Sequence, residues 1–546
     1  MDAAQPAHTT TSDLAFLFAA AVLAVASGPG IAYLAARTLA GGRADGMASC
    51  LDASIGGSPR RGGPRRAAVM CRGAATTVET AGPDRCPMFP FAPLPTRTTP
   101  TRPASRPVRL LLLFEKEWDG GGFAAQRATG EVQIHAEGFD LFRFPANARV
   151  LRFDAERFVD NLCAKYRGRI DAVVSNNEQF GSLLAALVAE RLGLPGTDPP
   201  AIVRAQHKLL ARERQHAALP AASVPAWALP LDLADRRVRD PAAVAAAVAR
   251  VGAAFPLFVK PVKATFSVLA RRVDDAAQLA QHLHFGRFER LLIERLVAPF
   301  AQVARGRVAL PCPPTRMLLE APVDAHQINV DGYMYQGRMR LLGVVDEWMY
   351  PGRHGGARHF LRFALPAAVP APAMAGIEVA CAQILVALGF RHGFFNAEFF
   401  VGADGSLRFI EINPRLASQM VDLHRAVSGH DIYRMLTALA RGQDPAAAPR
   451  LTPTAGVAAS FVFRRFDGAP QPAPPAAALG WLARTFPQAR LATYFKRGAS
   501  LAREVKWLGS HRYAVLNLAT TDAPELERAY EEICARFGWP CVRPQA

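Results

Sequence analysis

One segment in the second half of the chain, Gly393–Arg415, constrains the fold more than any other part of the sequence. Two apolar-rich stretches flank Asp404-Gly405, and Asp-Gly in that setting is a strong signal for a two-residue type I′ turn. If these two residues form the centre of the turn, Val401 faces Arg408, and positions farther from the turn pair in the same register. The segment therefore predicts a β-hairpin.

Polar residues gather on one side of this predicted hairpin. Four of them form two cross-strand pairs, Glu398 opposite Glu411 and Asn396 opposite Asn413. Like charges directly opposite each other are destabilising, so the facing carboxylates need a compensating positive charge. Carboxylate and amide oxygens suit a hard divalent cation, and Mg²⁺ typically uses one or two carboxylates together with substrate phosphates. A solvated outer face would carry mixed Lys and Glu instead. We therefore expect a divalent cation on this face, while Ile410 and Ile412 point into a core.

This hairpin resembles the metal-binding hairpin of the ATP-grasp superfamily, which follows the pattern Glu…Glu-x-Asn-x-Arg. Here the pattern reads Glu398…Glu411-Ile412-Asn413-Pro414-Arg415, so the resemblance implies that Glu398, Glu411 and Asn413 hold Mg²⁺ or Mn²⁺. The resemblance extends over about residues 107–450 and includes further motifs in the order of the family. They are an α/β leading domain, a Lys-Leu-Leu-Ala-Arg helix, a Val-Lys-Pro strand and an Ile-Glu-Arg hinge. The resemblance implies an α/β chain with a Rossmann-like domain, a two-lobed α+β ATP-grasp domain and a C-terminal α+β segment.

The resemblance also implies an ATP site built around two lysines. Only seven of the 64 basic residues are lysines, so a lysine stands out in this arginine-rich chain. Lys260 lies at the end of a predicted strand, Phe255–Pro261, and the family lysine at that place contacts the α- and β-phosphates. Lys208 matches an earlier family lysine on the nucleotide site. A solvated lysine is the alternative at either place.

The loop after Lys260 departs from the family pattern. Relatives usually carry a glycine- and serine-rich loop whose backbone N–H groups fold over the phosphates. Val262–Ser267 takes its place and contains no glycine. Thr265 and Ser267 offer hydroxyls, and Lys263 offers charge in place of backbone donors. The departure predicts a stiffer loop.

Two further positions complete the nucleotide site that the resemblance implies. Leu291–Val297 is similar to the hinge between the two ATP-grasp subdomains, which presents backbone groups and an acidic side chain to adenine, so Glu294 is the candidate. Many relatives carry glutamate near the ribose hydroxyls. Gln327 stands closest to that place here, and an amide also hydrogen-bonds a hydroxyl.

The substrate side is expected to use arginine. The resemblance places Arg415, two residues beyond Asn413, near an acyl phosphate. A second basic stretch, residues 350–363, is rich in glycine and arginine and fits either a substrate carboxylate or a flexible basic loop. Glu347 and Trp348 are candidates for lining a substrate pocket, with core packing as an equal alternative for Trp348.

Composition divides the chain into four predicted segments. They are an N-terminal extension and linker (1–106), a Rossmann-like pre-ATP-grasp domain (107–203), the ATP-grasp domain (204–450) and a C-terminal α+β segment (451–546). The first segment holds an apolar run, Leu14–Ala26, that resumes after Ser-Gly-Pro-Gly as Ile31–Ala36 and is barely long enough to span a bilayer. A hydrophobic anchor, a transit-like segment and a wrongly extended N-terminus with its true start at Met88 are the alternatives.

The second segment opens with an α/β unit. Val108–Phe114 and Ile170–Val174 are short apolar runs typical of buried parallel strands, and Gly181–Leu192 is predicted as a helix. There is no GxGxxG motif, so nothing local indicates a dinucleotide.

The formal charge of +18 reflects arginine spread over the chain. Nucleic-acid sites usually cluster Lys and Arg with interleaved aromatics, so the charge does not indicate a nucleic-acid partner. The eight cysteines show no CxxC and no zinc-ligand spacing, which indicates reduced thiols and a cytoplasmic location. Membrane association would arise only through the N-terminal apolar run.

The resemblance implies an ATP- and Mg²⁺-dependent ligase. It would join a small-molecule carboxylate, of the amino-acid or peptide type, to an amine through an acyl phosphate and release ADP and phosphate. A nucleotide-binding module without ligase activity is the first alternative, favoured by the glycine-free loop and Gln327. A carboxylase-like enzyme that uses bicarbonate is the second. No sequence pattern identifies the two substrates or the oligomeric state.

Overall fold

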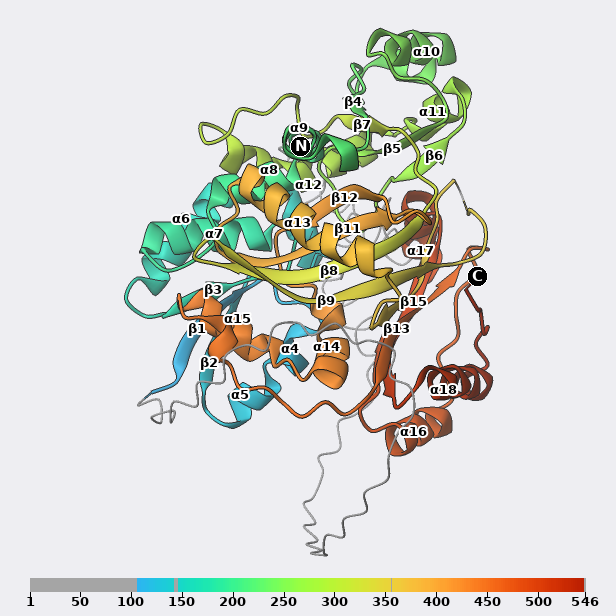
Figure 1. Ribbon diagram of the computed structural model, residues 1–546. Coiled ribbons are helices and arrows are strands. Elements are labelled where there is room, and N and C mark those ends of the chain that lie inside the picture. Colours follow the sequence, from blue (N-terminus) through green and yellow to red (C-terminus); the bar gives the residue numbers. More distant parts are fainter. Residues whose placement is uncertain (1–105, 142–145, 355, 545–546) are drawn as a thin grey trace, which may run out of the picture. The chain divides into compact units, whose positions relative to one another are not determined.

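Short apolar strands build three sheets in the part of the chain that the computed structural model describes, residues 106–141, 146–354 and 356–544 (Figure 1). The N-terminal apolar run and Met88 lie outside the described residues.

The first sheet is parallel, and its central strand is buried on both faces. In spatial order its strands are β2 (Val132–Glu137), β1 (Val108–Leu113) and β3 (Ala172–Val174). Leu111 and Leu113 enter one core together with α7 (Gly181–Leu192), whereas Leu110 and Leu112 enter another with α15 (Ile432–Ala440). The predicted strands and helix are confirmed. Helix α7 ends at Gly193, whose φ of +66° suits glycine.

The second sheet is small and antiparallel. In spatial order its strands are β4 (Ala226–Ala228), β7 (Met317–Glu320), β5 (Leu257–Pro261) and β6 (Arg271–Val273). Its core contains Leu257, Val259 and Leu319, and residues of α10 (Pro241–Arg250) and α11 (Ala276–His282) pack in the same core. The predicted strand at 255–261 is confirmed as β5.

The predicted hinge at Leu291–Val297 is wrong. These residues lie inside an 18-residue helix, α12 (Arg287–Ala304). The prediction rested on the similarity of a short motif to the family hinge, and a short apolar run of this kind also fits a helical segment. The chain passes from the second sheet to the third through residues 321–325, between β7 and β8 (His326–Tyr335).

The third sheet has eight antiparallel strands and holds the predicted hairpin. Besides β8, its strands are β9 (Arg338–Met349), β10 (Phe360–Leu365), β11 (Gly393–Val401), β12 (Leu407–Asn413), β13 (Val457–Arg465), β14 (Arg490–Thr493) and β15 (His511–Thr520). Their spatial order is β12-β11-β8-β9-β10-β13-β15-β14, so the strands of the C-terminal segment continue the sheet. Helix α13 (Ala371–Leu388) packs on one face, as Figure 1 shows.

The hairpin has a different turn from the one predicted, but its polar pairs are confirmed. Residues 402–406 form the loop between β11 and β12, and Val401 pairs with Leu407 rather than with Arg408. A β-bulge at Ile410 then restores the register, so that the structure pairs Glu398 with Glu411 and Asn396 with Asn413. Because Ile410 is the extra residue, Phe409 joins Ile412 in the core in its place.

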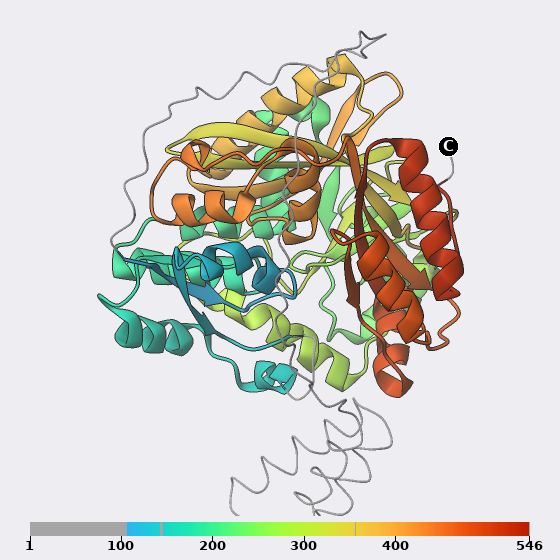
Figure 2. The ribbon, with the colours of Figure 1, turned by 90° about the horizontal axis from the view of Figure 1, so that it is seen from below.

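The remaining helices cover the sheets and the C-terminal strands (Figures 1 and 2). The α-helices are α4 (Asp119–Gly122), α5 (Ala124–Ala128), α6 (Ala155–Tyr166), α8 (Pro199–Gln206), α9 (Lys208–Ala218), α14 (Val421–Ser428), α16 (Ala476–Thr485), α17 (Gly498–Leu508) and α18 (Ala523–Phe537). Short 3₁₀ helices span Ala146–Arg152, Pro220–Ala222, Arg236–Arg239, Ser418–Met420 and Pro445–Ala447.

Candidate active site

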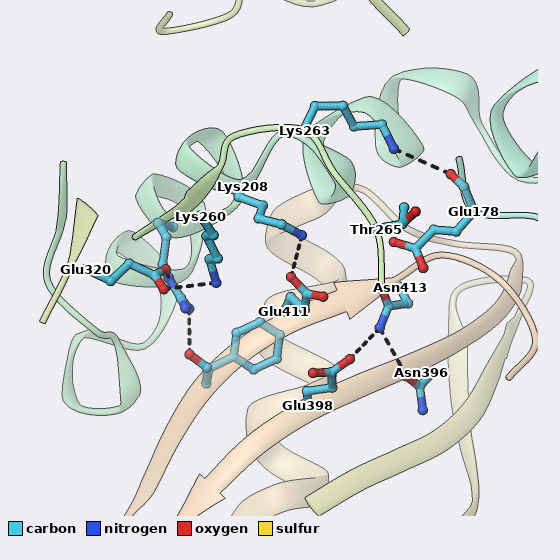
Figure 3. Close-up of polar contacts among 12 residues, drawn as sticks. Glu178, Lys208, Lys260, Lys263, Thr265, Glu320, Asn396, Glu398, Glu411 and Asn413 are labelled. Atoms are coloured by element: carbon cyan, nitrogen blue, oxygen red, sulfur yellow. Dashed lines mark hydrogen bonds and ion pairs between the residues drawn. The ribbon is translucent and has the colours of Figure 1, made fainter. Parts of the chain in front are cut away.

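The hairpin carboxylates meet a lysine from a distant part of the chain (Figure 3). Lys208, the first residue of α9, donates from Nζ to Oε2 of Glu411 at 2.5 Å. Asn413, on the same strand as Glu411, donates from Nδ2 to two residues of the neighbouring strand β11, to Glu398 Oε1 at 2.9 Å and to Asn396 Oδ1 at 3.1 Å. The structure therefore brings four predicted site residues together on one face of the third sheet.

The two carboxylates differ in their electrostatic surroundings. Burial, and then the negative charge of Glu411, raise the pKa of Glu398 above its usual range. Burial also opposes ionisation of Glu411, but Lys208 and Lys260 hold its pKa below the usual range. Lys208 thus bonds to Glu411 alone, and Glu398 has no bonded cation among the described residues, only the amides of Asn413 and Gln327. Two carboxylates and an amide form an oxygen donor set that fits Mg²⁺.

Lys260 is held by a buried ion-pair network that the sequence did not reveal. Its Nζ lies 2.9 Å from Glu320 Oε2, and Arg212 Nε donates to Glu320 Oε1 at 2.7 Å. Although burial opposes ionisation, the two cations lower the pKa of Glu320 to about 2. Burial lowers the pKa of Lys260. Arg212 was noted in the sequence only as the last residue of the Lys-Leu-Leu-Ala-Arg motif, and Glu320, the last residue of β7, was not singled out at all.

The loop after Lys260 adopts glycine-like conformations without glycine. Phe266, Ser267 and Leu269 have φ values of +60°, +53° and +59°. Lys263 is buried and donates from Nζ to the backbone oxygen of Glu178 at 3.4 Å, and burial lowers its pKa to about 8. Of the two residues of this loop that were predicted to contact the nucleotide, Lys263 faces the interior and Ser267 is exposed.

Arg415 is paired with a carboxylate from the first sheet. Its Nη2 lies 2.9 Å from Oε2 of Glu178, which follows β3. Polar residues at the carboxyl ends of parallel strands commonly form sites, and that signal could have identified Glu178 in the run Ser175–Glu178. The Rossmann-like domain therefore contributes directly to the candidate site.

The predicted adenine and ribose residues have different outcomes. Gln327 Nε2 donates to Glu398 Oε2 at 3.3 Å, so Gln327 joins the carboxylate cluster. Glu294 lies exposed on α12. It is outside residues 321–325, the crossover that connects the second sheet to the third, so the expectation that it stands on a hinge is wrong. In the basic stretch, Arg358 and Arg353 lie 3.4 and 4.0 Å from Asp324 within that crossover.

A series of buried hydrogen bonds through Asn396 and Asp331 holds Asn413 in position. Asn396 Nδ2 donates to Asp331 Oδ1 at 2.9 Å, and His424 of α14 lies 2.8 Å from the other oxygen of Asp331. Asp331 and His424 are both buried. This arrangement fixes the amide of Asn396, which in turn accepts the hydrogen bond from Asn413.

Two sheet-built lobes are joined by residues 321–325, with paired carboxylates on the larger sheet and buried lysines contributed by α9 and the smaller sheet. This arrangement defines the ATP-grasp class of fold. Residues 253–422 match the family described as the ATP-grasp domain, a family that binds ATP. The chain therefore contains an ATP-grasp domain.

Individual relatives agree with this assignment. The chain is 31% identical over 339 residues to carnosine synthase 1 of Gallus gallus; the match covers 61% of this chain and 34% of the relative, so the chain spans about a third of that protein's length. Among solved structures, L-amino acid ligase from Bacillus licheniformis matches with a TM-score of 0.56 at 15% identity, over 81% of this chain and 100% of that one. Carboxyaminoimidazole ribonucleotide synthase from Aspergillus clavatus, in complex with ATP, matches with a TM-score of 0.50 at 13% identity, over 79% and 98%. Such structural likenesses establish the fold.

Proposed function

We propose that this protein is an ATP- and Mg²⁺-dependent ligase that joins the carboxylate of an amino-acid or peptide-like substrate to an amine. The observation that carries the proposal is the facing pair Glu398 and Glu411, bonded to Asn413 and Lys208 on the sheet of an ATP-grasp fold. The names of two relatives, a carnosine synthase and an L-amino acid ligase, support the same class of reaction.

The cation site proposed here consists of Glu398, Glu411 and Asn413. Bound there, Mg²⁺ would neutralise charge on the nucleotide's phosphate oxygens. The chain's own cations act beside it: Lys208 and Lys260 contact the phosphates, and Glu320 orients Lys260. Lys263, held at the backbone of Glu178, adds charge where relatives use backbone donors.

The chemistry then proceeds by positioning and charge neutralisation. An oxygen of the substrate carboxylate attacks the γ-phosphorus, ADP leaves, and an acyl phosphate results. The amine attacks the acyl carbon, loses a proton, and phosphate leaves as the amide forms. Arg415 stabilises the oxyanion of the tetrahedral intermediate, with Glu178 holding the guanidinium in place.

One observation favours a second function, nucleotide binding without ligation. The loop at residues 264–270 carries Phe266, 43% exposed, where relatives place a flexible glycine-rich segment. A loop that closes poorly over the phosphates would allow ATP to bind without efficient phosphoryl transfer.

The test mixes the purified protein with Mg-ATP and a pool of amino acids and measures ADP, phosphate and peptide products. We expect amino-acid-dependent ADP release, and its loss in Glu411→Gln, which removes one of the facing charges while keeping the shape of the side chain. Glu378→Gln, an exposed change on α13, is the matched control and should retain activity. Tight ATP binding without ADP release for any amino acid would support the second function instead, and wild-type turnover by Glu411→Gln would refute the cation assignment.

A further inference from the structure

One more carboxylate on the same sheet, besides Glu398, Glu411 and Asp331, has no role in the chemistry described above. Glu347 of β9 is 2% exposed, and its Oε2 has no hydrogen-bond partner among the described residues. No salt bridge involves it in that part of the chain. A buried carboxylate without a counter-charge is costly, because ionised oxygens lose their hydration without compensation.

The register places Glu347 on the face that carries the hairpin carboxylates. Glu347 is opposite Gln327 on β8, and Gln327 donates to Glu398 of β11. Strands are spaced about 4.8 Å apart, so Glu347 and Glu398, two strands apart, lie on the order of 10 Å from each other. Within residues 106–141, 146–354 and 356–544, no three acidic, His or Cys side chains lie close enough to share one metal ion. Glu347 is therefore outside the cation site proposed for the hairpin.

The segment that follows Arg415 lies over this face of the sheet. Gln419 Nε2 donates to Ser460 Oγ of β13 at 2.9 Å. Ser460 is opposite Phe363 of β10, which is itself opposite Glu347, so the three stand in one row across the strands. The chain thus runs from Arg415, beside the hairpin, to a point over β13, with β9 and Glu347 lying between these two places in the strand order.

The surroundings of Glu347 are strongly negative. Burial, and then the charges of Glu398, Glu411 and Asp331, raise its pKa well above its usual range. A positively charged group bound beside Glu347 would neutralise this excess of negative charge. Two features of a ligand follow: it carries a cation, and it has an anionic end that reaches Arg415 and the hairpin.

We propose that Glu347 binds the ammonium group of the amino acid whose carboxylate is activated. The inference rests on the ligase function proposed above, and it names a specificity-determining residue for that reaction. The ammonium and carboxylate of an amino acid are only a few bonds apart. A molecule with its ammonium on Glu347 can therefore present its carboxylate toward the hairpin, across a gap on the order of 10 Å that also holds the reacting phosphate. Phe363, the neighbour of Glu347 on β10, supplies an apolar wall.

The experiment compares amino acids with the same carboxylic acids lacking the amino group. The pairs are alanine and propionate, leucine and 4-methylpentanoate, and phenylalanine and 3-phenylpropanoate. Wild type, Glu347→Gln and the control Glu378→Gln are assayed for ADP release at saturating Mg-ATP. Equilibrium binding of each acid in the presence of Mg²⁺ and ADP is measured in parallel. Glu347→Gln keeps the size of the side chain and removes an unpaired buried charge, so we expect it to fold.

In the expected result, Glu347→Gln loses about tenfold or more in kcat/KM and in affinity for the amino acids, because a charge-assisted hydrogen bond is lost. The des-amino acids should change by less than about twofold. Equal losses for both members of each pair would overturn the inference, as would a wild type that does not distinguish them. ADP release with the amino-acid preference intact in Glu347→Gln refutes the inference and leaves the ligase function standing. A Glu347-dependent preference in binding, without any ADP release, supports the inference and refutes the ligase function.

Discussion

Removing the charge of Glu320 should destabilise the lobe that holds Lys260. In Glu320→Gln, the buried cations Lys260 and Arg212 lose the carboxylate that lies 2.9 and 2.7 Å from them. The folded-state pKa of Glu320 is about 2, against an ordinary 4.5, and each unit of that difference corresponds to 1.36 kcal/mol. The pair is buried, so solvent screens it little, and we expect a loss of about 3 kcal/mol at pH 7. Breaking a buried ion pair from one side typically costs a similar amount, about 3–5 kcal/mol.

The pH dependence provides the sharper assay. Because the folded-state pKa of Glu320 is depressed, its contribution is fully present above pH 4.5, the ordinary value, and is lost as the pH falls toward 2. The free-energy difference between wild type and Glu320→Gln, measured by urea unfolding, should fall from about 3 kcal/mol at pH 7 to about 2 kcal/mol at pH 3.5. Other titrating groups cancel in this difference, and Glu378→Gln should stay within about 0.5 kcal/mol of wild type at both pH values. A difference below about 1 kcal/mol at pH 7, or one that does not decrease with acid, would refute the reasoning.

Two further predictions concern the hairpin support and the phosphate loop. Asp331→Asn disturbs the hydrogen bonds to Asn396 and His424 and so loosens Asn413; the Mg²⁺ concentration for half-maximal ADP release should rise about tenfold or more, and an unchanged requirement would contradict the supporting role. At Phe266, whose φ is +60°, Gly should be more stable than Ala by about 1 kcal/mol in urea unfolding, because only glycine adopts that conformation without cost; equal stability of the two variants would show that the loop is unstrained.

The hairpin shows how local pattern predicts a site even when one detail is wrong. The two-residue turn and the pairing of Val401 with Arg408 are wrong, yet Glu398 faces Glu411 as predicted. The alternation of side chains along a strand sets which residues share a face, and the bulge at Ile410 compensates for the longer turn. The predicted hinge rested only on the similarity of a short motif, and the apolar run at Leu291–Val297 lies in a helix instead.

The ion-pair partners of the charged groups could not be predicted from local sequence patterns. Lys208 and Glu411 are 203 residues apart in sequence, and Arg415 and Glu178 are 237 apart. Such contacts depend on how the first sheet and the two lobes pack together, which no spacing within one segment encodes. Glu320 ends a short apolar strand, and nothing in its neighbours distinguishes it from a surface residue until β5 and β7 pair.

The sequence by itself determined the hairpin, the carboxylates and amides on its face, the leading α/β unit and the two lysines that stand out among the arginines, because each depends on short-range spacing or on residue type. The tertiary structure alone decided that Glu320 holds Lys260, that Glu178 holds Arg415, and that Glu347 is buried with one carboxylate oxygen unbonded among the residues that the structure describes. The physical reason is that burial and ion pairing are properties of the packed chain. The desolvation cost of a carboxylate, its ion-pair partner and its role in a site are all set when distant strands bring other charges close to it.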